Sequence, residues 1–448
     1  IKQLTIHGDT RIDSYYWLNN RSNPEVIAYL DAENKYTENL MSHTRQLREK
    51  LYEEIVGRIK QTDMSVPFRF QGYEYITEYH QGQEHPVYLR RQSGQNGDNE
   101  VMLDVNQLAA AYDFYQIGGR NVSPDNNLLA FGEDTVSRRI YTIRFKDLRT
   151  GKLLPDRIDG TTGSVAWASD NKTVFYTKKD DTLRPFKIYR HILGTDPAID
   201  DEVYHEKDDT FYTVIYRSGS GKYLIIASVA TLSTEFRVLR ADQPQGSFQI
   251  IQSRARNHEY FVSHIDDRFY IRTNWNATNF RLMVMSESDK DKKHWKEVIP
   301  HRPDVLLEDI DLFQDYLVLS ERSNGITQIR IRPWDGTKEH YIKFEEDVFL
   351  AYTKDNYEQD THLLRLSYTS LSTPATTYDY DMRKQQLHLR KQQEVVGKFD
   401  PDDYKTERIY AEARDGTKIP ISLVYRKEFP QDGQAPLLLY AYGSYGHS

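Results

Sequence analysis

A serine flanked by glycines near the end of the printed sequence is the first candidate for chemistry. The motif is Gly443-Ser444-Tyr445-Gly446. A nucleophile elbow has the pattern Gly-x-Ser-x-Gly on a sharp strand-to-helix turn, which exposes the serine hydroxyl. Here Tyr442 stands where the first glycine would be, and no helical pattern follows. Ser444 is therefore not predicted to be a nucleophile.

Metal and cofactor sites find little support in the residue pattern. Among 14 histidines, the close pairs are His80/His85 and His258/His264. Neither spacing matches the i, i+4 zinc pair of a helix, and no third ligand is evident. The sequence has no cysteine, which excludes disulfides, thiol catalysis and zinc sites with cysteine ligands. Because no phosphate-binding glycine-rich loop occurs either, we predict neither a metal nor a cofactor.

Composition narrows the class of protein. Hydrophobic residues make up 38% of the 448 residues, charged residues 28% and aromatic residues 12%, as in a globular protein with many amphipathic strands. Lys and Arg number 59 against 67 Asp and Glu, so the formal net charge is −8, and no basic block stands out. We therefore expect no nucleic-acid partner. Since no run of 18 apolar residues occurs, we also expect no membrane partner. The lack of cysteine fits a reducing compartment, so we expect a cytoplasmic location.

The N-terminal part has helical periodicity. Asn23 can cap a helix that has Pro24 at its first position, and this helix is predicted to reach about Leu40. A second helix follows, with an apolar stripe that must pack on another surface. The stripe consists of Leu47, Leu51, Ile55 and Ile59. Ser65-Val66-Pro67 ends this segment.

From about Arg69 the apolar period becomes two, which is typical of strands; examples are residues 141–146 and 327–332. Short polar turns recur, represented by Gly72, Asp125, Asp170, Ser220, Asp267, Asp315 and Asp360. Their successive spacings are 53, 45, 50, 47, 48 and 45 residues. A period of this length with about four strands per repeat predicts a β-propeller of seven blades. The alternative is a large β-sandwich, which would have no fixed period.

After the repeats, residues 407–413 and 419–425 read as a hairpin with a glycine in its turn. Residues 435–442 form a nearly continuous apolar run, as expected of a strand buried on both faces of an α/β sheet. A hairpin and one buried strand cannot form such a domain alone. The sheet is therefore expected to need further chain.

Several segments resemble the oligopeptidase B branch of the prolyl oligopeptidase family of serine peptidases. They are His7-Gly8-Asp9-Thr10-Arg11-Ile12-Asp13-Ser14-Tyr15-Tyr16-Trp17-Leu18, residues 32–37, residues 58–67, Arg184-Pro185-Phe186-Lys187, residues 191–195 and Tyr440-Ala441-Tyr442-Gly443-Ser444-Tyr445-Gly446. The resemblance implies a mainly β protein in which a seven-bladed propeller is inserted into an α/β-hydrolase domain. Residues 1–68 would be the helical extension of that domain, residues 69–398 the propeller, and residues 399–448 the first strands of the catalytic sheet.

The same resemblance implies a serine endopeptidase that cleaves short peptides on the carboxyl side of Arg or Lys, with the propeller acting as a size filter. Cleavage after proline, as in prolyl oligopeptidase, and a non-catalytic propeller that binds a partner are the alternatives. The family's serine, acid and histidine would lie beyond Ser448. The expected partners are short basic peptides and a C-terminal catalytic segment, in the same or a separate chain, and this chain alone is expected to be inactive.

Two tyrosines carry over from the family motif. Tyr442 falls where the family places a hydroxyl of the oxyanion hole, and Tyr445 where it places an aromatic wall of the pocket for the residue before the cut. An oxyanion-hole donor must be fixed about 3 Å from the carbonyl oxygen that becomes negatively charged. Without the resemblance, Tyr442 would be read as a packed strand residue.

Overall fold

The structure is a computed structural model that describes residues 1–94, 97–289 and 291–443. The chain divides into two compact units. The first comprises Ile1–Lys60 with Val395–Phe399, and the second comprises Gln61–Glu394 with Asp400–Ser448. Each unit is described by itself below.

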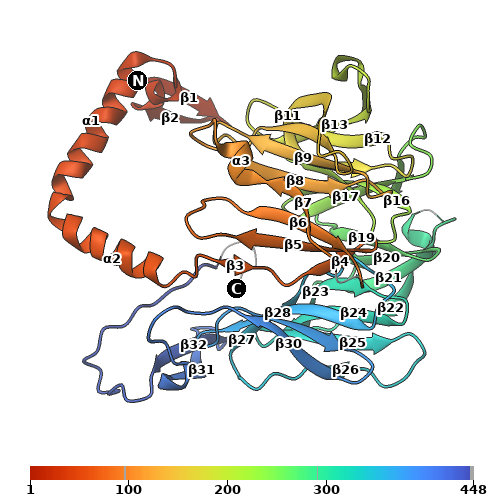
Figure 1. Cartoon of the computed structure of the whole chain (residues 1–448). Helices are drawn as coiled ribbons and strands as arrows, with labels where there is room; N and C mark the ends of the chain where they lie inside the picture. Colours follow the sequence, from red (N-terminus) through yellow and green to blue (C-terminus); the bar gives the residue numbers. More distant parts are fainter. Residues whose placement is uncertain (95–96, 290, 444–448) are drawn as a thin grey trace. The chain divides into compact units, whose positions relative to one another are not determined.

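The first unit contains the two predicted helices, α1 (Pro24–Leu40) and α2 (Arg45–Gly57), which follow one another end to end (Figure 1). The Asn23 side chain caps α1 by accepting a hydrogen bond from the Glu25 N–H at 2.9 Å, as predicted. The predicted apolar stripe is exposed, with fractions between 46% and 61% for Leu47, Leu51 and Ile55 of α2 and for Ile59, which lies just after it. The packing predicted for this stripe is therefore absent among the described residues.

A hairpin at the N-terminus was not predicted. Strands β1 (Lys2–Ile6) and β2 (Asp9–Asp13) pair antiparallel, with Ile6 opposite Asp9. The two-residue loop has positive φ at both positions, 54° at His7 and 81° at Gly8, which matches a tight type I′ turn. Histidine at the first position is not a usual turn signal, so residue type alone did not reveal the hairpin.

The second unit is mainly β. Its first sheet consists of β3 (Asp63–Met64), β4 (Phe68–Phe70), β5 (Tyr73–Tyr79), β6 (Val87–Gln92) and β7 (Glu100–Asp104). The next contains seven strands: β8 (Gln116–Val122), β9 (Leu128–Asp134), β10 (Tyr141–Asp147), β11 (Leu153–Trp167), β12 (Thr173–Lys179), β13 (Pro185–Ile192) and β14 (Asp201–His205). The first strand begins at Asp63, before the predicted boundary at residue 69.

Four sheets of four strands follow in chain order. The first consists of β15 (Tyr212–Arg217), β16 (Tyr223–Ala230), β17 (Ser233–Arg240) and β18 (Gln249–Gln252). The second consists of β19 (Tyr260–Ile265), β20 (Arg268–Thr273), β21 (Arg281–Ser286) and β22 (Lys296–Ile299). The last two are β23 (Val305–Leu312), β24 (Tyr316–Ser323), β25 (Ile326–Pro333) and β26 (His340–Tyr341), then β27 (Phe349–Thr353), β28 (Leu363–Ser370), β29 (Thr376–Asp381) and β30 (Gln386–Gln392). Short helices lie in the connections: α3 (Val105–Ala109) and the 3₁₀ helices Tyr16–Asn19, Ser42–Thr44, Pro197–Ile199, Lys292–His294 and Pro401–Asp403.

The repeat analysis located the turns correctly. Each of the seven predicted turns joins two antiparallel strands: β4/β5, β8/β9, β11/β12, β15/β16, β19/β20, β23/β24 and β27/β28. However, the described strands form six sheets between Asp63 and Gln392 rather than seven, so the prediction of seven separate blades is not met. The reason is β11, a 15-residue strand that pairs with β10 in its first half and with β12 in its second.

Close backbone packing permits this long strand. A methyl group added at Gly119 in β8 would lie 1.9 Å from the Ser164 Oγ in β11. A methyl group at Gly132 in β9 would lie 2.5 Å from the Gly163 Cα. Glycine is therefore required where the second half of β11 passes β8 and β9.

The apolar cores lie between successive sheets. One cluster joins β16, β17 and the β19–β21 strands around Tyr260, and another joins β24, β25 and the β28–β29 strands around Leu364. The last sheet contacts the first through Arg365, which donates to the Pro67 carbonyl at 2.6 Å, and Lys391, which donates to the Asp63 carboxylate at 2.6 Å. The sheets therefore form a closed ring, a β-propeller, although no described strand crosses this seam.

The predicted C-terminal hairpin is present as β31 (Tyr404–Glu412) and β32 (Lys418–Arg426). It contacts the turn between β24 and β25, where Arg408 donates to the Asn324 carbonyl. The strand predicted for residues 435–442 is not formed, and Leu437, Leu438 and Leu439 are 83%, 89% and 80% exposed. A strand forms only where a neighbour takes its backbone hydrogen bonds, and none of the described strands does so here.

Candidate functional site

The two site residues taken from the motif have different outcomes. Tyr442 lies in the segment after β32, outside any strand, and is 61% exposed. Tyr445 lies outside the described residues. The oxyanion role of Tyr442 and the pocket role of Tyr445 therefore stay predictions.

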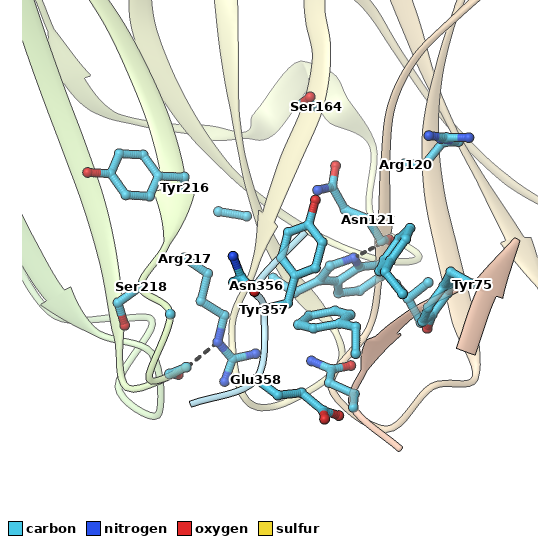
Figure 2. A pocket seen from close by; sticks show the side chains of 18 of the residues that line it. Tyr75, Arg120, Asn121, Ser164, Tyr216, Arg217, Ser218, Asn356, Tyr357 and Glu358 are labelled. Atoms are coloured by element: carbon cyan, nitrogen blue, oxygen red, sulfur yellow. Dashed lines mark hydrogen bonds between the residues drawn. The ribbon is translucent and has the colours of Figure 1, made fainter. Parts of the chain in front are cut away.

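The structure contains a large cavity that the sequence did not predict. Its volume is about 1050 Å³, at the upper end of the range for small-ligand sites. Strands of the first three sheets line it, together with the β23–β24 turn and the β27–β28 loop; Figure 2 shows part of this lining. Its aromatic lining consists of Phe68, Phe70, Tyr75, Tyr88, Trp167, Tyr216 and Tyr357.

Part of the cavity wall spans the seam between the first and last sheets. Phe68, on β4, lies 5.3 Å from the Tyr75 ring and 5.1 Å from the Tyr357 ring, measured between ring centroids. Phe70 lies 5.7 Å from the Tyr357 ring. Tyr357 follows β27 in the last sheet, so these rings join two sheets that share no strand. Aromatic packing thus closes the ring and forms an apolar surface in the cavity.

Two arginines line the cavity and come from different sheets, Arg120 from β8 and Arg217 from β15 (Figure 2). Arg217 donates from Nε to the Gly221 carbonyl at 2.7 Å and from Nη2 to the Ser169 hydroxyl at 3.0 Å. Burial lowers its pKa. The Arg217 guanidinium is therefore tied to two turns at the end of the sheets.

Arg120 is held differently. Its Cζ lies 3.5 Å from the centroid of the Tyr88 ring, a cation–π contact. Burial lowers its pKa, although the nearby Tyr88, Tyr357 and Tyr79 rings act in the opposite direction. The side chain is accessible to solvent all the same. A guanidinium that is accessible yet surrounded by protein lies in a hollow that solvent enters.

Further groups on neighbouring sheets show the effect of partial burial on ionisation. Tyr216, which lines the cavity, is 37% exposed, and burial raises its pKa. Burial also raises the pKa of Asp311, on β23, to about 6, against the effect of the hydrogen bond that its carboxylate accepts from the Thr353 hydroxyl at 2.7 Å. A raised carboxylate pKa is typical of functional sites from which water is partly excluded, but burial raises the pKa of purely structural carboxylates in the same way.

The histidines singled out in the sequence have structural contacts. His258 is buried, with Nε2 3.0 Å from the Thr273 hydroxyl, and His264 is buried with Nδ1 2.9 Å from the Ser220 hydroxyl. Among residues 1–94, 97–289 and 291–443, no three His, Cys, Asp or Glu side chains gather as a metal site would require. No helix in the same ranges is both long and apolar enough to span a bilayer.

The second unit is a β-propeller, because its sheets form a closed ring around a cavity large enough for a small ligand. A family model described as the N-terminal β-propeller domain of prolyl oligopeptidase matches residues 2–393. The chain therefore belongs to the prolyl oligopeptidase family of serine peptidases.

Individual relatives agree with this assignment. The chain is 43% identical to a dipeptidyl aminopeptidase BI from Pseudoxanthomonas mexicana, over 99% of the chain and 64% of the relative. It is 33% identical to protease 2 from Moraxella lacunata, over 98% of the chain and 64% of the relative. Among solved structures, oligopeptidase B from Leishmania major aligns with a TM-score of 0.91 and 31% identity, over 98% of this chain and 64% of that one. The chain thus spans just under two thirds of the length of these relatives.

The cavity residues escaped prediction for a clear reason. Arg120 and Arg217 lie on strands of two sheets, Tyr357 lies in the loop between β27 and β28, and the three share no motif. The sequence did place a turn beside each of them, at Asp125, Ser220 and Asp360. Since these turns recur at the same end of each repeat, residues just before them could have been grouped as candidates.

Proposed function

We propose that this chain is the propeller-bearing part of a serine oligopeptidase that hydrolyses short peptides on the carboxyl side of Arg or Lys. The observation that carries the proposal is the TM-score of 0.91 to oligopeptidase B from Leishmania major over 98% of the chain. A structure of oligopeptidase B from Trypanosoma brucei with covalently bound antipain aligns almost as well, with a TM-score of 0.90. The serine, acid and histidine of the triad would lie in the part of these relatives that this chain does not match.

In this proposal the termini of the chain belong to an α/β-hydrolase domain, residues 1–68 as its extension and residues 399–448 as its first strands. Exposed apolar surface supports this assignment. The α2 stripe and Leu437–Leu439 are apolar yet exposed, and a further part of the protein would bury them. The triad-bearing segment, in the same or a separate polypeptide, is thus the main proposed partner.

We further propose that the propeller has seven blades, two of which share β11. Buried side chains support this count. The cluster of Phe145, Ile158, Trp167 and Tyr176 brings the β9–β10 half of the seven-stranded sheet against its β12 half. A flat sheet could not pack its own halves together, so the two halves act as neighbouring blades. The propeller would then admit only short peptides to the active site.

A second activity has its own support. The relative with 43% identity bears the name dipeptidyl aminopeptidase, which removes dipeptides from a free N-terminus. The relatives named prolyl endopeptidase share 24% and 21% identity, which gives cleavage after proline weaker support. A non-catalytic propeller has no specific observation in its favour. For localisation we propose the cytoplasm, with no nucleic-acid or membrane partner.

Three chromogenic substrates test the proposed specificity on the protein with its catalytic segment. The first is an N-blocked dipeptide anilide with Arg before the anilide. The second is the same dipeptide anilide with a free N-terminus, and the third is an N-blocked dipeptide anilide with Pro before the anilide. We expect rapid turnover of the first, inhibition by a serine-directed reagent, and no activity from residues 1–448 alone. Preference for the free N-terminus would favour the dipeptidyl aminopeptidase, and preference for proline would contradict both.

Substitution of Tyr442 tests its proposed oxyanion role. In the active protein, Tyr442→Phe removes one donor and keeps the ring, so kcat for an amide substrate should fall by about 10²–10³ with little change in KM. A thermal melt should be nearly unchanged. If kcat stays within about twofold, far below the loss expected for an oxyanion donor, Tyr442 has no such role. The proposed pocket role of Tyr445 predicts the opposite pattern for Tyr445→Ala, a rise in KM.

A further inference from the structure

The Arg120 guanidinium lines the cavity and has no carboxylate partner among the described residues. It carries five N–H donors. Among the described residues, none of these donors forms a hydrogen bond or ion pair, and the cation–π contact with Tyr88 is its one close interaction. Two other arginines on the first and second sheets do have carboxylate partners. Arg90 pairs with Glu100 at 2.8 Å, and Arg144 pairs with Glu133 at 3.1 Å.

Stacking on Tyr88 prepares this guanidinium for a ligand. The Tyr88 ring lies 3.5 Å from Cζ and holds the guanidinium in place, and a cation–π contact of this kind uses none of the N–H donors in a hydrogen bond. Two parallel donors of a fixed guanidinium match the two oxygens of a carboxylate. The carboxylates that line the same cavity, Glu358 and Asp360, form no ion pair with Arg120 in the described part of the chain. The cavity thus contains a guanidinium with which no described carboxylate pairs at ion-pair distance.

The other walls indicate an organic ligand. The rings of Phe68, Phe70 and Tyr357 form an apolar surface far larger than a simple anion needs. The side-chain oxygen of Gln71, another lining residue, is buried and accepts no hydrogen bond from any described residue. A ligand that offers an N–H to Gln71, an apolar side chain to the rings and a carboxylate to Arg120 would satisfy all three.

We propose that the cavity binds the C-terminal carboxylate of a short peptide on Arg120, with an apolar side chain against Phe68, Phe70 and Tyr357. Peptide hydrolysis releases fragments with a new C-terminal carboxylate, so the site would hold product or inhibitory peptides. The binding itself does not depend on the proposed peptidase function. Its failure and the failure of that function are therefore distinguishable.

Calorimetry with acetyl-Ala-Phe tests the proposal. This peptide has a free carboxylate, a blocked N-terminus and no basic residue, so it is a substrate for neither proposed activity. We expect acetyl-Ala-Phe-amide to bind at least about tenfold more weakly, because it lacks the charge that a bidentate guanidinium recognises. Binding of the acid should also weaken as salt increases.

Variants locate the site. Arg120→Gln should weaken binding of the acid by about tenfold or more and bring it close to that of the amide. The matched control is Arg157→Gln, because Arg157 pairs with Asp159 on an exposed part of β11 and lies outside the cavity. It should bind as the unsubstituted protein does. Turnover of the N-blocked Arg-anilide, measured on the same samples, reports the peptidase function separately.

Several results would overturn the proposal. Equal binding of acid and amide by the unsubstituted protein would do so without any variant, even if Arg120→Gln failed to fold. Unchanged binding by a folded Arg120→Gln protein would place the peptide elsewhere. If inorganic phosphate bound as tightly as acetyl-Ala-Phe and displaced it, the cavity would be a simple anion site, and the peptide part of the proposal would be wrong.

Discussion

Two runs of three apolar residues in the second unit have opposite surroundings. Leu317-Val318-Leu319 lies in β24, between β23 and β25, and all three side chains are 0% exposed. Leu437-Leu438-Leu439 lies outside any described strand, and its side chains are 80% to 89% exposed. The two runs have nearly the same composition. The composition of an apolar run therefore does not determine whether the run is buried. Burial depends on neighbouring strands that cover it.

The largest effect that we expect from this contrast concerns buried charge. Glu321 on β24 is 0% exposed and accepts hydrogen bonds from Arg330 at 2.6 Å and from the Tyr341 hydroxyl at 2.7 Å. Glu321→Gln removes the buried counter-charge of Arg330, which keeps only the exposed Glu339 carboxylate at 3.0 Å, so the free energy of unfolding should fall, by at most about 3–5 kcal/mol. Urea denaturation of the second unit measures the change.

A matched control for Glu321 lies on the hairpin. Glu407 on β31 pairs with Lys405 at the surface. Glu407→Gln should leave the urea midpoint unchanged, since exposed ion pairs contribute little. A loss for Glu407→Gln as large as that for Glu321→Gln would mean that the hairpin is as deeply packed as the sheets, and the contrast between the two regions would fail.

The apolar runs themselves give the next effect. Leu317→Ala removes a fully buried side chain and should lower the free energy of unfolding by about 2–5 kcal/mol. Leu438→Ala should have no measurable effect in the chain of residues 1–448. In the protein that also carries the catalytic segment, the effect of Leu438→Ala should grow toward that of Leu317→Ala. No growth would contradict the proposal that a further part of the sheet buries this run.

A smaller, pH-dependent effect is expected at His191, which is 0% exposed on β13. Burial lowers its pKa, but hydrogen bonds with Asp200 at 2.8 Å and Asp156 at 3.1 Å outweigh burial and raise the pKa overall. A raised pKa in the folded state stabilises the fold below about pH 6.5, the unfolded value, and this stabilisation is lost as pH rises through the folded pKa.

Urea denaturation between pH 6 and pH 9 measures this dependence. The unsubstituted protein should lose stability across the range, and His191→Gln should lose less of it over the same interval. His43→Gln serves as the control because His43 is exposed, and it should leave the slope unchanged. A slope that is the same in His191→Gln would show that His191 does not carry the proton in question.

The sequence predicted correctly those elements that depend on residues close together in the chain. The cap at Asn23, the seven turns, β10, β25 and the C-terminal hairpin all follow from neighbouring residues. The failures involve partners that are remote in the sequence. The continuity of β11 depends on how closely Gly119 and Ser164 approach, and the strand expected at residues 435–442 depends on neighbours that the described residues do not provide.

By itself, the sequence determined the repeat, the strand alternation and the family, because turn spacing and periodicity are properties of consecutive residues. Only the tertiary structure decided that Arg120, Gln71 and Tyr357 share one cavity. Their separation along the chain is large, and ring closure between the first and last sheets brings them together. A guanidinium that finds its charge partner within its own sheet, as Arg90 does, leaves no site. At Arg120 the packing supplies a ring for one face and no counter-ion, and that arrangement cannot be read from adjacent residues.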